Sequence, residues 1–428
     1  MTWLVNQKVW TITRNAVIRA LYARKGALGP RLGNWVFGLE KYEVTTLRSF
    51  TGHRIKISAE PSPLIGGLVS SRNYVKKVRF GASLPFNAVL LENATLSLNR
   101  RGGFALHEDK LLTRTPPTGS TAQIVFGGEP VAGECVQVEA AVALKRPQTV
   151  ETIPAGIYVG SLAPHNWFHW IIDTLPVIHF LRHLPPQFQN YPVLLPPISD
   201  KSRDWHQSLR IALRGRPIKM IDAQKLIKVR SLVMTEGAST AFPRPWKSQQ
   251  QSGRIFFREN MLTAFADEVR AKATPEKFAT EPTRRLFIGR KSGGMRDYNQ
   301  DEIFEVAGEY GFELVFLEDL PFRNSVRLFN EAQIVIGPHG AGFANILFSQ
   351  RGTTVLIWTW KDQRGDNWYE SLFAALDMQA AFLHYEPLPP HETQVDPRGA
   401  PYTLNVENFR TRLEEVLVSA DSSSDSSK

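Results

Sequence analysis

The alternation of hydrophobic and polar positions divides the chain into blocks of different structural character. Through residues 151–240, and again through 252–385, short apolar runs typical of strands alternate with amphipathic stretches typical of helices. Such alternation is typical of parallel sheets whose strands are joined by crossover helices. The pattern therefore predicts an α/β protein with two Rossmann-like domains that face a cleft.

Other stretches break this rhythm and mark the boundaries of the predicted domains. Residues 75–145 contain short β-prone runs separated by turn signals, and the Pro-rich polar residues 240–250 predict a linker. The last residues are Ser/Asp-rich, and such low-complexity tails are typically disordered. We therefore predict four parts: a basic lead-in (1–74), an N-terminal Rossmann-like domain with a β-rich region (75–245), a C-terminal Rossmann-like domain (246–390), and a helix with a disordered tail (391–428).

The hydrophobic pattern also predicts individual helices and their starts. The apolar segment 165–184 predicts either one helix or a pair of helices around Pro176. A helix is expected over about residues 252–272, and another should start near Phe343. Asn299, with Glu302 three residues on, is close to the capping-box pattern of a helix start.

The first 31 residues form a basic segment without any acidic residue. Trp3, Trp10, Val17 and Leu21 recur at spacings of four and seven, so that one helical face could hold them. A basic amphipathic helix of this kind can lie in an anionic membrane interface. The alternative is a solvated arm, or a helix packed on its own domain.

Composition narrows the class of protein. The 428 residues are 43% hydrophobic and 21% charged, which is ordinary for a globular protein. One Cys excludes an internal disulfide and a CxxC zinc site, and favours a reducing cytoplasmic location. We expect neither a transmembrane helix nor a secretion signal, because no apolar run is long enough. The net charge of +10 attracts anionic partners, but no recognition motif indicates nucleic acid.

The window of residues 334–345 predicts a site for an anion. A buried strand ends at Gly337, and His339, Gly340 and Gly342 then form a turn of small residues before a helix. Small residues let the backbone approach a ligand, and N–H groups at a helix start favour a phosphate. The alternative is a turn whose glycines serve only packing.

A second window places basic residues where another strand ends. Arg290 and Lys291 follow an apolar strand, and Arg296 lies beyond a glycine pair in the next loop. Ligands of open α/β sheets bind beyond the carboxyl ends of strands, and a guanidinium fork suits a diphosphate. For Arg296, a simple surface charge is the alternative.

A third window holds a potential general base. His165, His169 and Asp173 recur every four residues and could share a helical face. Asp173 lies among apolar residues, where a carboxylate needs either a partner or a task such as deprotonating a hydroxyl. A purely structural His–Asp hydrogen bond explains the pattern equally well. We found no HExxH, DxD, GxSxG or Walker phosphate loop, so neither a metal nor hydrolase chemistry is expected.

Taken in order, four segments resemble glycosyltransferase family 61. They are residues 92–113, the segment NWFHWIIDTLPVIHFL (166–181), the segment RLFIGRKSGGMRDYNQDEIF (285–304), and residues 311–348 with their His-Gly-Ala-Gly turn. That family includes plant xylan-decorating transferases, animal O-linked N-acetylglucosaminyltransferases and bacterial capsular-polysaccharide proteins.

The resemblance implies a GT-B fold and an inverting, metal-independent transfer. A sugar, with a UDP-sugar favoured as donor, would pass to a hydroxyl of a glycan or lipid-linked acceptor. The N-terminal domain would bind the acceptor and the C-terminal domain the donor. By position, Asp173 and His169 would be the base or base-orienting groups. Arg290 would grip the diphosphate with support from Arg296 and Lys291, and His339, Gly340 and Gly342 would line the donor site. No cofactor is implied beyond the nucleotide-sugar.

The chain also departs from the family in places. Ile357 and Trp358 lie where members often have an acidic residue, so the contact made by that carboxylate is not carried over. Eukaryotic members carry an anchor or secretion signal that we do not expect here. The resemblance is therefore closer to a bacterial, cytoplasmic hexosyl- or pentosyltransferase of capsule or other polysaccharide biosynthesis, peripheral at the inner membrane. The alternative is a non-catalytic nucleotide- or glycan-binding protein of the same fold.

Overall fold

The computed structural model describes most of the chain from residue 39 onward. The described residues are 16, 17, 20, 39–47, 49–57, 60–70, 72–99, 102–113, 135–138, 141–145, 151–160, 163–198, 202–222, 226–242, 254–273, 281–291, 296–360, 368–385 and 400–425. The predicted basic N-terminal helix therefore lies outside the described residues, apart from Ala16, Val17 and Ala20. No helix in the described ranges has the length and apolar character needed to cross a bilayer.

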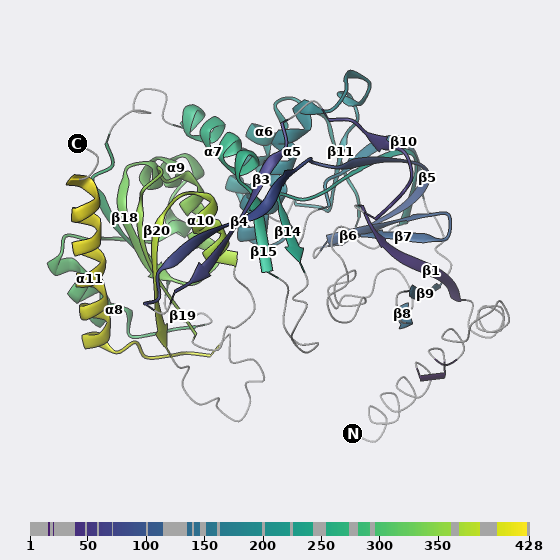
Figure 1. Cartoon of the computed structure of the whole chain (residues 1–428). Coiled ribbons are helices and arrows are strands. Elements are labelled where there is room, and N and C mark those ends of the chain that lie inside the picture. Colours follow the sequence, from purple (N-terminus) through teal and green to yellow (C-terminus); the bar gives the residue numbers. More distant parts are fainter. Residues whose placement is uncertain are drawn as a thin grey trace.

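A mixed sheet of 11 strands forms one side of the described structure (Figure 1). Its order is β12-β11-β10-β13-β5-β6-β7-β1-β9-β8, with β2 paired to β5. The strands are β1 (Leu39–Thr46), β2 (Arg54–Ile55), β5 (Ala88–Asn99), β6 (Gly102–His107), β7 (Lys110–Thr113), β8 (Cys135–Val138), β9 (Ala141–Lys145), β10 (Glu151–Tyr158), β11 (Val193–Leu195), β12 (Ile218–Met220) and β13 (Leu226–Thr235).

The two halves of this sheet follow different pairing rules. Strands β10 to β13 pair in parallel, as the strand–helix alternation of 151–240 predicts. Strand β13 then pairs antiparallel with β5, which continues into the antiparallel strands β6 and β7. The β-rich region predicted for 75–145 is thus confirmed where the structure describes it, and it extends the parallel sheet at one edge.

A second, parallel sheet forms the other side of the molecule, with order β17-β16-β18-β19-β20. Its strands read as nearly continuous apolar runs because helices cover both faces of a parallel sheet. The strands are β16 (Arg284–Ile288), β17 (Glu313–Val315), β18 (Ala332–Pro338), β19 (Thr354–Trp360) and β20 (Gln379–Tyr385). The helices around it are α8 (Gln300–Glu309), α9 (Phe322–Asn330), η5 (Ala341–Phe348), α10 (Trp368–Ala375) and α11 (Val406–Asp425). The predicted mixed α/β class is confirmed.

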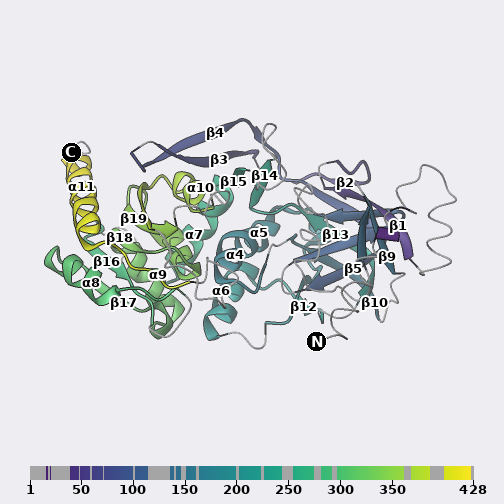
Figure 2. The same cartoon turned by 90° about the horizontal axis from the view of Figure 1, so that it is seen from below.

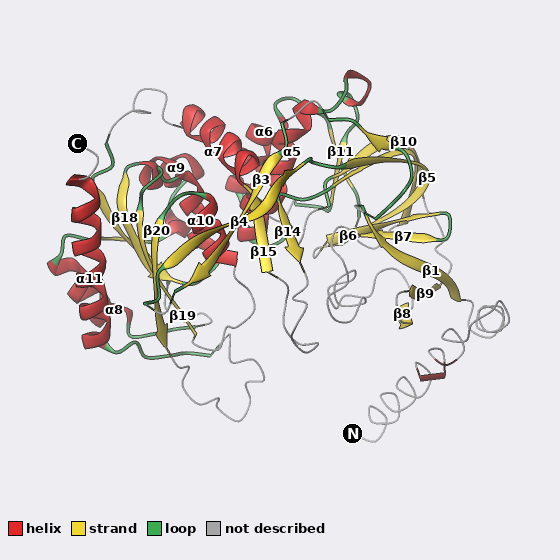
Figure 3. Cartoon of the chain, viewed as in Figure 1, coloured by secondary structure: helices red, strands yellow, loops and turns green. Residues whose placement is uncertain are grey.

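Helices lie between the two sheets in the described structure (Figure 3). They are α4 (Trp167–His169), η1 (Trp170–Thr174), α5 (Leu175–Phe180), η2 (Leu181–His183), η3 (Pro186–Phe188), α6 (Arg203–Leu213) and α7 (Glu259–Ala273), with the short turn η4 (Leu317–Asp319) near the second sheet. Their buried side chains belong to one hydrophobic cluster that also includes residues from both sheets, so the two sides share a core.

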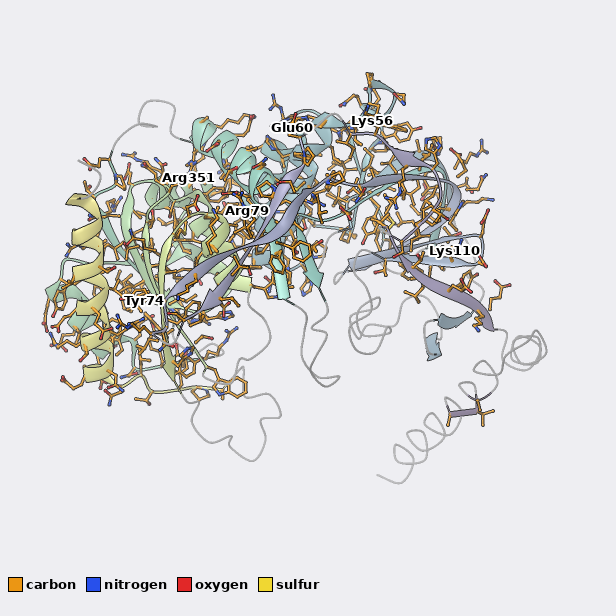
Figure 4. All side chains as sticks on the ribbon, viewed as in Figure 1. Lys56, Glu60, Tyr74, Arg79, Lys110 and Arg351 are labelled. Carbon is orange, nitrogen blue, oxygen red and sulfur yellow. The ribbon has the colours of Figure 1, made fainter. Side chains whose placement is uncertain are left out.

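A long hairpin joins the N-terminal part of the chain to the second sheet. Strands β3 (Ser62–Val69) and β4 (Val75–Leu84) form a four-stranded sheet with β14 (Ser239–Phe242) and β15 (Arg254–Arg258), and the hairpin extends over α10 (Figure 2). Gly67 allows this close approach, because an added Cβ would lie 1.9 Å from the carbonyl oxygen of Glu370. At the far end of the hairpin, Tyr74 pairs with Ala381 of β20 (Figure 4).

Several element predictions were wrong in detail. The predicted helix 252–272 begins only at Glu259, because residues 254–258 pair as β15 with β14 and β3. The predicted helix after the glycine turn has 3₁₀ rather than α pitch over its whole length. Helix α8 does begin directly after Asn299, as predicted, but the Asn299 side chain does not cap it. That side chain donates to Glu302 at 2.7 Å and exchanges hydrogen bonds with the backbone of Leu404, which ties α8 to the segment before α11.

The C-terminal tail also differs from its expected disorder. Helix α11 continues to Asp425, into the Ser-rich segment. The apolar side chains of its earlier turns recur on one face and are buried, so packing anchors the helix from which the Ser-rich segment continues. They are Phe409, Leu413, Val416, Leu417 and Ala420.

Candidate functional site

The segment that carries His169 and Asp173 is a single helical run that changes pitch. The side chain of Asn166 accepts a hydrogen bond from the N–H of Phe168 at 2.9 Å and begins α4. The run then widens into the π-helix η1 and continues as α5, without the break that Pro176 could cause. Proline cannot donate a backbone hydrogen bond to the preceding turn, and a π-turn is one way for a helix to accommodate this. Asp173 lies on this π-turn.

Asp173 and His169 form a hydrogen-bonded pair with unequal exposure. The Nδ1 atom of His169 lies 3.1 Å from Oδ2 of Asp173. The Asp173 side chain is 0% exposed, whereas that of His169 is 21% exposed and lines a cleft of about 220 Å³. The buried carboxylate fixes the orientation and tautomer of the imidazole, and Nε2 is then the nitrogen that can take a proton. The geometry therefore favours His169 as the base and Asp173 as the group that orients it.

The cleft is built from both sides of the molecule. Asn166, Phe168 and His169 line it from the helical run, and Arg296, His339 and Gly340 line it from the loops of the second sheet. The remaining lining residues are Ala341, Trp368 and Tyr369. The structure thus brings five of the predicted site residues to one place: four in the cleft itself and Asp173 directly behind His169.

Arg290 and Arg296 converge on the glycine turn. A guanidinium nitrogen of Arg290 donates to the carbonyl of His339 at 2.7 Å, and one of Arg296 donates to the same carbonyl at 3.0 Å. Burial, and then the neighbouring charge of Arg290, lower the pKa of Arg296 below its ordinary value. Two like charges held together in a partly buried place are stabilised by an anion, and guanidinium forks match phosphate oxygens.

The side chain of Gln300 forms two hydrogen bonds with the backbone of Arg290. The amide N–H of Arg290 donates to Oε1 of Gln300 at 2.6 Å, and Nε2 of Gln300 donates back to the carbonyl of Arg290 at 3.0 Å. These two hydrogen bonds fix the backbone of Arg290 just beyond the end of β16. No local sequence signal marks Gln300, because the helix-start pattern involves only Asn299 and Glu302.

His339 lines the cleft as an uncharged side chain. Burial first, and then the charges of Arg296 and Arg290, lower its pKa to about 3. Above that pH it can donate or accept a hydrogen bond but carries no charge. Its ring meets Tyr369 edge to face at 4.9 Å, and the Tyr369 hydroxyl donates to the carbonyl of Gly340 at 2.5 Å.

Aromatic residues of α10 complete the cleft, and no sequence motif points to them. Trp368 packs edge to face against His169 at 4.9 Å, and Tyr369 supports the glycine turn. Their segment shows only an ordinary amphipathic helix in the sequence, so no local signal marks them. The fold alone places α10 opposite α4.

The other three predicted site residues, Arg290, Lys291 and Gly342, do not line this cleft. Lys291 is exposed and pairs with Asp319 at 2.5 Å, in a hollow beside the cleft that it shares with Arg290. Gly342 lines a separate hollow with Trp167 and Asn345. Within the described ranges, no three His, Cys, Asp or Glu side chains come together as a metal-binding group.

The close packing at Gly340 leads us to expect that a larger residue there weakens anion binding. Its backbone is extended, so alanine is allowed there, but an added Cβ would lie 2.3 Å from the guanidinium of Arg290. Gly340→Ala should therefore displace Arg290 and weaken the binding of inorganic pyrophosphate about tenfold or more by calorimetry. Gly308→Ala is the control, since its added Cβ meets open space. Equal affinity in both variants would show that Arg290 does not contact the anion.

Comparison with known proteins supplies independent information on this region. Residues 167–356 match the family model described as Glycosyltransferase 61. The matched span runs from α4 into β19, and so includes every predicted site residue from His169 to Gly342. No match was found among curated proteins.

Proposed function

The chain belongs to glycosyltransferase family 61, and on that premise we propose an inverting, metal-independent transfer of a sugar from a nucleotide-sugar to a hydroxyl group. Membership of the family implies glycosyltransferase activity. The observation that carries the finer proposal is a cleft lined by both His169, which Asp173 supports from behind, and Arg296. Arg290 binds the same glycine turn as Arg296 from the neighbouring hollow. A base for the acceptor and a positive site for a leaving diphosphate are the two groups that such a reaction needs.

The proposed architecture is GT-B, with domains at 75–245 and 246–390 between the lead-in and the C-terminal helix. The parallel strands β10 to β13 of the mixed sheet, the parallel second sheet and the cleft between the two sides support this arrangement. The β3–β4 hairpin crosses the proposed boundary and packs on α10, so it would restrict how far the two domains can separate.

The reaction would proceed as a single displacement. Nε2 of His169 accepts the proton of the acceptor hydroxyl as the hydroxyl oxygen attacks the anomeric carbon. The bond between that carbon and the diphosphate oxygen breaks, and its electron pair leaves with the nucleoside diphosphate. One in-line attack inverts the anomeric configuration. Asp173 stabilises the imidazolium that forms, because its carboxylate faces Nδ1.

The leaving diphosphate would be neutralised by side chains rather than by a divalent ion. Arg290 and Arg296 supply two positive charges at the turn, while neutral His339 supplies a hydrogen bond. Gly340 keeps the turn thin enough for Arg290 to reach it. Preorganised charges of this kind stabilise the transition state without reorganisation during the reaction. Gly342 and Lys291, in the neighbouring hollows, would contact other parts of the donor.

The substrates are proposed at the level of class. A UDP-linked hexose or pentose is the favoured donor, and a glycan or lipid-linked glycan of bacterial capsule or other polysaccharide synthesis is the favoured acceptor. Contact of residues 1–31 with an anionic inner membrane stays a prediction, since that segment lies outside the described residues.

A turnover experiment tests the proposal. The protein is incubated with a panel of UDP-, GDP- and CDP-sugars, with EDTA or with Mn²⁺, and release of nucleoside diphosphate is measured. We expect one donor to be hydrolysed slowly or transferred, with equal rates in EDTA, and NMR should show an inverted product. Loss of all turnover in EDTA would contradict metal independence. A protein that binds one nucleotide-sugar but never turns it over would be a non-catalytic binding protein instead.

A further inference from the structure

A polar hollow lies outside the cleft, at the C-terminal ends of α5 and α6. Its volume is about 300 Å³, and Arg182, Arg214 and Arg216 line it together with His179 and Gln189. We call it the arginine pocket. None of the residues assigned above to the transfer reaction lines it.

Arg216 forms the fixed wall of the arginine pocket. Its guanidinium donates to the carbonyls of Leu181, Phe188 and Gln189 at 3.2, 2.8 and 2.7 Å, and to Oε1 of Gln189 at 2.7 Å. These acceptors are neutral, so the positive charge is held in place without an ion pair in the described structure. Burial lowers the pKa of Arg216 below its ordinary value.

Arg182 contributes a second positive charge whose contacts are also neutral. Its Nη1 lies 2.6 Å from Nε2 of His179, and its Nε donates to Nε2 of His183 at 3.2 Å. Burial, and then the charge of Arg182, lower the pKa of His179 to about 4, so this imidazole is uncharged near neutral pH. Among the described residues, Arg182 makes no ion pair with a carboxylate.

The nearest carboxylate is shared among several cations. Glu268 of α7 pairs with Arg214 at 3.0 Å and with Lys272 at 2.9 Å. Its single negative charge cannot balance Arg182, Arg214, Arg216 and Lys272 together. Burial, and then repulsion from Arg214, lower the pKa of Arg182 below its ordinary value. The arginine pocket therefore carries a positive excess that a bound anion would relieve.

Exposed apolar residues follow the arginine pocket along the chain. Ile218 and Met220 follow Pro217, a lining residue, and are 39% and 36% exposed. They lie two residues apart on β12, the edge strand of the large sheet, so both point to the same face. Basic groups next to exposed apolar side chains are typical of surfaces that contact anionic lipid.

We propose that the arginine pocket binds a phosphate group, held by Arg182 and Arg214 against the fixed guanidinium of Arg216. Guanidinium forks bind phosphate oxygens through paired hydrogen bonds, and the volume fits one such group. The phosphate can be that of an anionic lipid headgroup or of a soluble phosphate compound. The apolar neighbours on β12 favour the headgroup.

The test compares an arginine pocket variant with a charge-matched control. Arg182→Gln with Arg214→Gln removes two charges from the pocket, and Arg182→Gln alone spares the Arg214–Glu268 pair in case the double variant unfolds. Lys76→Gln with Arg79→Gln removes two exposed charges from β4 (Figure 4 labels Arg79). Binding of inorganic phosphate is measured by calorimetry. Flotation is measured with vesicles of phosphatidylcholine alone or with phosphatidylglycerol.

We expect the arginine pocket variants to bind inorganic phosphate about tenfold more weakly than both the wild type and the β4 control. Loss of flotation with phosphatidylglycerol vesicles in the same variants would identify the headgroup as the source, and unchanged flotation would identify a soluble phosphate. Equal phosphate affinity in the arginine pocket variants and the control would overturn the proposal. The transfer reaction is unaffected by either result, since its residues lie outside the pocket.

Discussion

Replacing His169 by alanine is expected to lower kcat about 10²–10⁴-fold, with little change in the donor KM. The imidazole is the one member of the His169–Asp173 pair that lines the cleft, so it alone can reach an acceptor hydroxyl. Its removal leaves the arginine pair and the glycine turn intact, and donor binding should persist. Steady-state kinetics with the donor found in the turnover experiment measure both values.

Two variants show whether His169 acts as a base. His165→Ala is the matched control, because this exposed histidine lies in the same segment but does not line the cleft. Asp173→Asn should retain the helix but lower kcat, since an amide can donate to Nδ1 and leave Nε2 protonated. His339 does not replace His169 as the base, because burial and then the charges of Arg296 and Arg290 lower the pKa of His339 to about 3.

Retention of more than a tenth of wild-type kcat in His169→Ala would show that another group deprotonates the acceptor. A loss of thermal stability in Asp173→Asn without a change in kcat would assign the pair a structural role only.

Replacing Arg290 by alanine is expected to weaken nucleoside diphosphate binding about tenfold or more and to lower kcat about 10²–10³-fold. The position of Arg290 is fixed by Gln300 on its backbone and by the His339 carbonyl on its side chain. Arg290→Lys should recover only part of the loss, because an ammonium cannot form the paired bonds of a guanidinium. Calorimetry with UDP, GDP, CDP and ADP in EDTA measures the affinities.

Arg285→Ala is the control for this experiment. Arg285 lies at the other end of β16 and donates to the carbonyl of Tyr310, so its loss removes the same charge away from the cleft. If both variants bind the preferred diphosphate as tightly as the wild type, Arg290 does not bind the diphosphate. If no diphosphate binds the wild type in any condition, the nucleotide-sugar proposal fails, and a glycan-binding protein of the same fold becomes the better description.

The sequence by itself determined the elements that carry the site. Strand–helix alternation predicted the parallel strands β10 to β13 and the parallel second sheet, because apolar runs of strand length must be covered on two faces. The sequence also identified Asp173 as a carboxylate among apolar residues. It identified Arg290 and the 339–342 turn as candidate ligand-binding groups, because both follow the end of a strand. These signals are local: each arises from residue types within about a dozen positions.

Only the tertiary structure decided how these pieces act together. The sequence could not say which of His169 and Asp173 faces the ligand, because the π-turn that buries Asp173 depends on packing around the helix. It placed Arg290, Lys291 and Arg296 in one group, whereas the fold turns Lys291 toward Asp319 and away from the cleft. Trp368, Tyr369 and Gln300 carry no local signal and become part of the site through contacts far apart in the sequence. The path of the β3–β4 hairpin over α10 likewise depends on contacts between residues far apart in the sequence. The sequence shows only the glycine at position 67 that permits the close approach.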